Sequence, residues 1–166
     1  MKKILFLAVV ATIVCASAFG QAKQKANKDT ENFRYDIECA GNSTAGTYLV
    51  KVWSYSRRLN VAENQCRKNA VHGVIFKGFS GGTDCVGQKA LAKNPGVEME
   101  YESYFKTFFE DGGECLKYAS IIGGTMETMK LKGGMYKVGV VVSVQKDELR
   151  KALEAAGVIK GLSSGF

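Results

Sequence analysis

The hydrophobic pattern of two early segments of the chain predicts a pair of strands. From Phe33 to Cys39 every second residue is apolar, which is the spacing of a strand buried on one face. The turn formers AGNSTAG follow, and a run rich in valine and aromatic residues then extends from Thr47 to Tyr55. Because turn residues join the two runs, we expect a hairpin. The second run has apolar residues on both faces, so we expect its strand to lie nearer the centre of the sheet.

Between Val61 and Phe79 the apolar period changes to three and four residues, which predicts a helix. The stripe on its buried face is made of small residues, namely Ala62, Cys66, Ala70 and Gly73. Small side chains let a helix lie close against a sheet. We therefore expect this segment to be the central helix of the domain.

Paired glycines divide the last part of the chain into three apolar runs, which predict three further strands. The runs are residues 116–122, 125–132 and 135–144. Gly123-Gly124 and Gly133-Gly134 separate them, and such pairs favour tight hairpins because glycine tolerates positive φ angles. The sequence KDELRKALEAAG follows the last strand and predicts a helix that ends at Gly157.

An insertion from residue 80 to residue 115 separates the central helix from the last three strands. Its sequence YESYFKTFFEDGG places aromatic residues at helical intervals and predicts a third, short helix. The aromatic residues, which are also the candidate binding residues, are Tyr101, Tyr104, Phe105, Phe108 and Phe109. We expect them to pack onto the core of the domain, and the alternative is an exposed groove for a partner.

This order of elements predicts an α+β domain over residues 32–166. We expect an antiparallel sheet of about five strands, two main helices packed on one face, and a disulfide-bracketed insertion that carries the third helix. A parallel α/β arrangement would require strands and helices to alternate regularly, and they do not. A lysine-rich polar tail, residues 21–31, precedes the domain and is expected to be a flexible spacer.

The first residues have the layout of a secretory signal peptide, predicted over residues 1–20. Two lysines precede an apolar run, residues 4–15, that is short for a membrane span. Cleavage after Gly20 or after Ala18 satisfies the preference for small residues. We expect an exported protein that is periplasmic or associated with the outer membrane, with secretion as an alternative.

Four cysteines remain after this cleavage: Cys39, Cys66, Cys85 and Cys115. An even number in an exported chain favours disulfides. We expect Cys85 to pair with Cys115, which would close a loop of about 31 residues and stabilise the fold by about 3 to 4 kcal/mol. A bridge between Cys39 and Cys66 is the weaker prediction, because Cys66 could also be a buried thiol in the helix stripe.

His72 is the candidate for acid–base catalysis, because histidine titrates near neutral pH. The helical period places it at the boundary of the buried face, where a histidine usually satisfies a local hydrogen bond. No serine or cysteine near it has a recognisable nucleophile context.

Other chemistry has little support in the sequence. The chain has a single histidine and no C-x-x-C pair, so no metal site and no cofactor is predicted. The loop acids match no calcium loop and are expected to be solvated; they are Asp84, Glu110, Asp111 and Glu114. The formal net charge is +7, but the basic residues form no stripe, so nucleic-acid binding is not expected.

Two segments carry a resemblance to known proteins. AENQCRKNAVHGVIFKGF and YKVGVVVSVQKDELRKAL resemble the small envelope domain of outer-membrane lipoproteins and of the N-terminal part of the flagellar assembly protein T family. The matching framework positions are Tyr136, Val138, Val140, Val142 and Lys146 to Leu149. The chain is also similar to exported bacterial proteins of unknown function, on KNAVHGVIFKG and GLSSGF. These resemblances imply a common fold and no catalytic residues.

The expected function is that of a non-enzymatic exported envelope protein, an assembly or interaction module with an envelope protein as its partner. One alternative is a small exported hydrolase that uses His72 with carboxylates of the insertion. A second alternative is a secreted ligand-binding or inhibitory protein.

Overall fold

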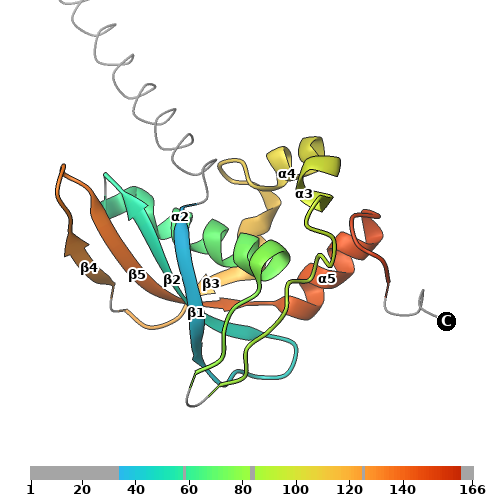
Figure 1. Ribbon diagram of the computed structural model, residues 1–166, viewed down its shortest axis with the longest axis horizontal. Coiled ribbons are helices and arrows are strands. Elements are labelled where there is room, and N and C mark those ends of the chain that lie inside the picture. The colour runs from blue at the N-terminus through green and yellow to red at the C-terminus, as the bar shows by residue number, and fades with distance from the viewer. Residues whose placement is uncertain (1–33, 58, 83–84, 125, 162–166) are drawn as a thin grey trace, which may run out of the picture. The chain divides into compact units, whose positions relative to one another are not determined.

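The computed structural model describes residues 34–57, 59–82, 85–124 and 126–161. The predicted signal peptide, the polar tail and Asp84 lie outside these residues. The described part has an antiparallel sheet of five strands together with helices, so the predicted α+β class is confirmed (Figure 1). None of its helices is long and apolar enough to cross a membrane.

The elements follow one another in the predicted order. The strands are β1 (Tyr35–Gly41), β2 (Tyr48–Ser56), β3 (Ala119–Ile121), β4 (Glu127–Lys130) and β5 (Tyr136–Val144). The α-helices are α2 (Leu59–His72), α3 (Val97–Glu100), α4 (Glu102–Phe108) and α5 (Lys146–Ala155). Two short helices of other types are the π-helix η1 (Gly73–Lys77) and the 3-10 helix η2 (Glu114–Tyr118).

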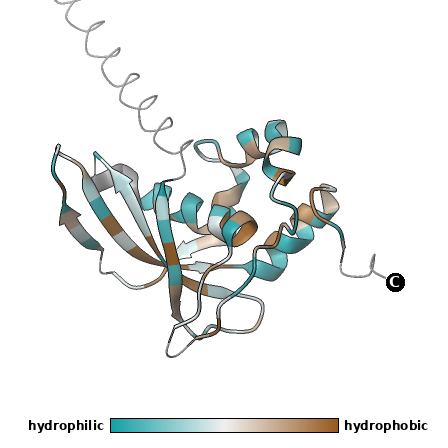
Figure 2. Ribbon diagram, viewed as in Figure 1, coloured by the Kyte–Doolittle hydropathy of each residue, from teal (hydrophilic) through white to brown (hydrophobic). Residues whose placement is uncertain are grey.

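Strands β1 and β2 form the predicted hairpin, and β2 pairs along its whole length with β5. The pairing runs from Tyr48 opposite Val144 to Ser56 opposite Tyr136. Figure 2 shows hydrophobic bands along these strands, as expected for strands with one buried face. The prediction that the second strand is more central is confirmed, because β2 lies between β1 and β5.

The prediction of a hairpin at Gly123-Gly124 is wrong. Strands β3 and β4 do not pair with each other, and both pair with β5. Ile121 lies opposite Val142 and Glu127 lies opposite Gly139, so β3 and β4 are two parts of one edge strand. The nine-residue β5 offers a longer ladder than the three-residue β3, and the glycine pair loops out between the parts.

The second glycine pair does form a hairpin turn. The backbone N–H of Leu131 donates to the carbonyl of Met135 at 2.8 Å, which closes the β4–β5 turn. Gly133 and Gly134 have φ angles of 80° and 73° there, a region that residues with a Cβ rarely adopt.

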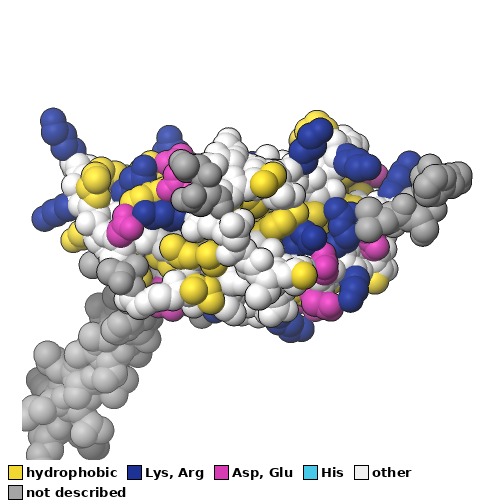
Figure 3. All heavy atoms as spheres, turned by 90° about the horizontal axis from the view of Figure 1, so that it is seen from below, with side chains coloured by type: hydrophobic (Ala, Val, Ile, Leu, Met, Phe, Trp, Pro, Cys, Tyr) yellow, Lys and Arg dark blue, Asp and Glu magenta, His cyan; other side chains and the backbone are white. Residues whose placement is uncertain are grey.

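On the other face of the sheet from α2, polar and charged side chains surround a tryptophan. Trp53 is half-buried, and the Lys51 and Lys137 ammonium groups lie 4.5 and 5.1 Å from its ring centroid. Lys137 also binds the Asp36 carboxylate at 3.1 Å. Figure 3 shows the molecule from below relative to Figure 1. Hydrophobic side chains lie between charged ones on this surface, and no histidine is visible.

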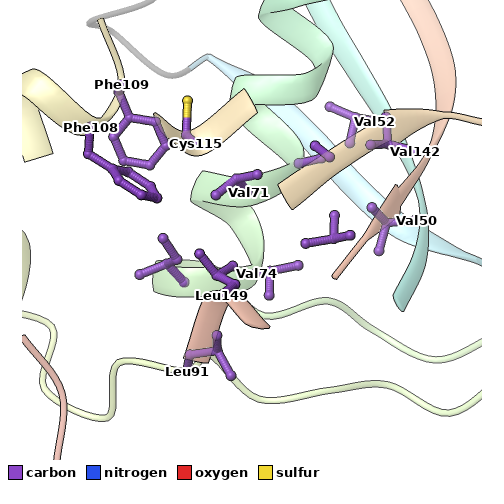
Figure 4. Packing of buried hydrophobic residues seen from close by; sticks show 14 of the residues in the cluster. Val50, Val52, Val71, Val74, Leu91, Phe108, Phe109, Cys115, Val142 and Leu149 are labelled. Atoms are coloured by element: carbon purple, nitrogen blue, oxygen red, sulfur yellow. The ribbon is translucent and has the colours of Figure 1, made fainter. Parts of the chain in front are cut away.

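The core lies between the sheet and α2, which contacts β2 and β5. Val50 and Val142 from the sheet and Val71 from α2 are fully buried there (Figure 4). Helix α5 adds Leu149 and Leu153, which are also fully buried. Burying such side chains stabilises a fold by about 1.5 to 3 kcal/mol each.

Candidate functional site

His72 is the last residue of α2, and its side chain lies inside the core. Only 4 % of its surface is exposed. Its Nδ1 lies 2.7 Å from the Tyr35 hydroxyl, and its Nε2 lies 3.0 Å from a carboxylate oxygen of Glu98. The rings of Phe76 and Phe109 pack beside it. The predicted boundary position is therefore a buried one, where three elements distant in the sequence meet.

The local backbone explains why Tyr35 can reach the histidine. A Cβ on Gly73 would lie 2.6 Å from Cδ1 of Ile37 and 3.3 Å from a ring carbon of Tyr35, so the glycine lets these two side chains of β1 lie close to the helix. The π-helix η1 begins at Gly73, and π-turns within helices often accompany functional sites. The turn also brings the Lys77 ammonium 3.8 Å from the Tyr35 ring centroid.

The electrostatics of the cluster favour one arrangement of protons. Burial raises the pKa of Tyr35, with a further contribution from Glu98, so the phenol keeps its proton. Burial lowers the pKa of His72, and the hydrogen bond from His72 lowers the pKa of Glu98. A neutral imidazole then accepts from the Tyr35 hydroxyl at Nδ1 and donates from Nε2 to the Glu98 carboxylate.

This arrangement suits a structural role better than a catalytic one. A histidine that activates a nucleophile needs one ring nitrogen toward that nucleophile and the other toward an orienting group. Here Glu98 is placed as an orienting group, but Tyr35 occupies the opposite nitrogen. The thiols of Cys66 and Cys115 are poor nucleophiles, because burial raises the pKa of each to about 11.

The aromatic residues of the insertion pack onto the core. Phe105, Phe108 and Phe109 are buried, while Tyr101 and Tyr104 are half-buried. The Tyr101 hydroxyl donates to the carbonyl of Gly157 at 3.0 Å, which ties this segment to the end of α5. The predicted packing onto the core is thus seen, and the alternative of an open aromatic groove is not supported.

The disulfide pairing differs from the predicted one. Cys39 is bonded to Cys85, with Cα atoms 6.3 Å apart, so the pairings of Cys85 with Cys115 and of Cys39 with Cys66 are wrong. Cys66 and Cys115 are free and buried, as the alternative for Cys66 anticipated. The bond forms because the segment after η1 folds back beside β1. Residues 38 and 80 make a parallel bridge there, which local sequence patterns do not reveal.

A small cavity of about 170 Å³ lies beside this disulfide. Its lining includes Tyr48, Phe79, Gln88 and both bonded cysteines. The Tyr48 hydroxyl donates to the side-chain oxygen of Gln88 at 3.0 Å, so two polar groups of the cavity wall bind each other. Ligand sites usually measure about 300 to 1,000 Å³, so this cavity suits water or a very small molecule.

Two of the candidate acids of the insertion form separate ion pairs with lysines. Asp111 binds the buried Lys68 at 2.9 Å, and Glu114 binds Lys117 at 3.2 Å. Glu110 is exposed. Within the part of the chain that the structure describes, no three histidine, cysteine or acidic residues are grouped to hold a metal ion.

One surface was not identified from the sequence: the outer edge of β4, with which no further strand pairs among the described residues. The large hydrophobic residues on or next to this edge are Ile122, Met126 and Met129, which are 48 %, 37 % and 56 % exposed. All four residues of β4 are exposed. The sequence signal is the methionine and isoleucine that flank the glycine pair, but the apolar pattern there predicts strands without saying which residues are exposed.

Comparison with known proteins assigns the chain to no family. No family model matches the chain, and no curated protein or solved structure matches it either.

Proposed function

We propose that this protein is a non-enzymatic exported domain of the bacterial envelope that binds another protein through the β4 edge. The observation that carries the proposal is the gathering of exposed hydrophobic residues there. Within the described part of the chain, Met126, Met129 and Ile122 are exposed along the β4 edge, whereas Phe105, Phe108 and Phe109 of the insertion are buried. Exposed apolar residues that gather in this way are typical of interaction sites.

Export is supported by two further features. The first residues have the layout of a signal peptide, and the Cys39–Cys85 disulfide is of the kind that forms in oxidising compartments. Placement in the periplasm or at the outer membrane, and a role in assembly, follow from the resemblance to envelope domains and are part of the proposal.

A hydrolase remains the second candidate, because the structure brings Glu98 of the insertion to His72 at 3.0 Å. The Tyr35 hydroxyl occupies Nδ1, so the cluster would have to open before the imidazole could serve a substrate. This requirement makes the interaction domain the better-supported function.

Site-specific photo-crosslinking in cells tests the proposal. A photo-reactive residue at position 129 is expected to give a discrete crosslinked species in the envelope fraction. Position 99 provides a matched control, because Met99 is a methionine that is 84 % exposed but lies on α3, away from the edge. The absence of a specific product at 129, or the same products from both positions, would contradict the proposed function.

A further inference from the structure

We infer that β4 accepts an extended acidic segment of a partner protein as an added antiparallel strand. This inference rests on the proposed function and specifies how the partner binds. In strand addition, backbone hydrogen bonds at a sheet edge supply affinity, and alternate side chains of the added segment supply specificity.

The hairpin shows which backbone groups of β4 are available. The Leu131 N–H bonds to Met135, and hydrogen-bonded pairs alternate along an antiparallel ladder. Residues 127 and 129 therefore bond to β5 through Gly139 and Lys137. Thr128 and Lys130 then direct their N–H and carbonyl groups away from β5, toward the open edge.

The other part of the same edge strand is closed. Arg67 on α2 donates from Nε to the carbonyl of Ala119 in β3 at 2.9 Å, and from Nη2 to the carbonyl of Leu116. An arginine covers the edge at β3, whereas all four residues of β4 are exposed. Proteins generally cover or block sheet edges, because an open edge can pair with another chain. The β4 part of this edge is therefore a candidate site for an added strand.

The side chains around β4 offer an adaptable apolar surface. Met129 is on the same face of the sheet as Trp53, and Met126 and Ile122 precede it along the edge. Methionine is flexible and polarisable, and it is common at surfaces that adapt to different partner sequences.

Charge selects the kind of partner. Lys130 and Lys132 are exposed, and neither is paired with an acid among the described residues. The nearest acidic residue of the strand, Glu127, is already neutralised by Lys51 at 2.7 Å. At the end of the molecule where Figure 1 places the β4–β5 turn, Figure 3 shows lysine or arginine side chains beside hydrophobic ones.

An acidic segment would therefore find complementary charge at this edge. A second copy of the chain is a poorer occupant, because pairing two β4 edges would bring these lysines toward one another.

A proline substitution tests the backbone contribution. Thr128→Pro removes an N–H that points outward, so it should block strand addition and leave the β4–β5 ladder intact. Thr128→Ala is the matched control because it keeps the N–H. The probe is a fluorescein-labelled peptide of about eight residues in which valine and glutamate alternate. We expect the purified mature protein and Thr128→Ala to bind it within about twofold of each other, and Thr128→Pro to bind it at least about tenfold more weakly.

A charge test does not depend on how well the proline variant folds. Lys130→Glu combined with Lys132→Glu is expected to weaken binding of the acidic peptide by about tenfold or more. A control peptide of alternating valine and lysine is expected to bind weakly to the unaltered protein. On binding of the acidic peptide, hydrogen exchange should slow at the amides of residues 128 and 130.

The outcomes separate this inference from the proposed function. Equal binding by Thr128→Pro, equal binding of the basic peptide, or no binding of the acidic peptide would overturn strand addition. If position 129 still crosslinks to a partner in Thr128→Pro cells, the interaction function stands and strand addition fails. If position 129 never crosslinks to a partner in cells, the proposed function fails, whatever the peptide does.

Discussion

Trp53 lies directly across Gly139 on the neighbouring strand β5. The two residues are opposite each other in the ladder, and a Cβ on Gly139 would lie 2.5 Å from a carbon of the indole ring. Glycine at this position lets the ring lie against the backbone, where its N–H donates to Glu38 at 3.0 Å.

Gly139→Ala is expected to displace the ring and lower the free energy of unfolding by about 1 to 3 kcal/mol. Trp53 is the only tryptophan, so a change in its fluorescence would report the displacement directly. Gly124→Ala is the control, because its added Cβ meets nothing within 4 Å, and it should change stability by less than about 0.5 kcal/mol. Unchanged fluorescence and stability in Gly139→Ala would show that the ring does not depend on the glycine.

Cys39→Ser combined with Cys85→Ser is expected to lower stability by about 4 kcal/mol in the chain-entropy model, because the bond closes a long loop. The two residues are 46 positions apart, which sets the size of that loop. Chemical denaturation with and without a reductant measures the effect.

Non-reducing peptide mapping should recover Cys39 joined to Cys85. Cys66 and Cys115 should resist alkylation in the folded protein at neutral pH, because both are buried and their pKa values are raised to about 11. A peptide that joins Cys85 to Cys115 would refute the pairing.

The His72 cluster predicts that stability falls as the pH is lowered below neutrality. Burial lowers the pKa of His72 below its ordinary value of 6.5, so the unfolded state takes up a proton first as the pH falls. The pKa of Glu98 is also lowered, chiefly by the hydrogen bond from His72, so its contribution is present above pH 4.5 and is lost below it.

Denaturation between pH 8 and pH 4 tests this expectation. His72→Gln is expected to lower stability at pH 8 and to flatten the decline that begins near pH 6.5. The same decline in His72→Gln and in the unaltered protein would assign it to other groups.

Arg67 is expected to contribute to stability through the backbone of β3. Arg67→Ala would leave the carbonyls of Ala119 and Leu116 without their guanidinium donors, at a cost of about 1 to 3 kcal/mol. Arg67→Lys restores a charge but cannot donate to both carbonyls in the same geometry, so it should recover only part of the loss. Equal stability of all three proteins in chemical denaturation would contradict this role.

The sequence by itself determined the five strands, the two main helices and the aromatic helix of the insertion, together with their order. The valines from Val138 to Val144 alternate so regularly that one face of β5 had to be buried, and the small residues of α2 marked the face that meets the sheet. These patterns are local, because the identity of a strand or helix depends on neighbours within a few positions. The α+β class followed from their succession.

The tertiary structure decided which distant residues meet. The pairing of Cys39 with Cys85, the contact of His72 with Glu98, and the sharing of β5 by β3 and β4 all join segments whose separation carries no periodic signal. Cysteine spacing leaves several pairings open, and a glycine pair permits either a hairpin or a looped-out bulge. The path of the chain around the core selects among them, because the valines of the sheet, the aromatic residues of the insertion and α2 pack together in one buried core. The open edge at β4 is a product of that same packing.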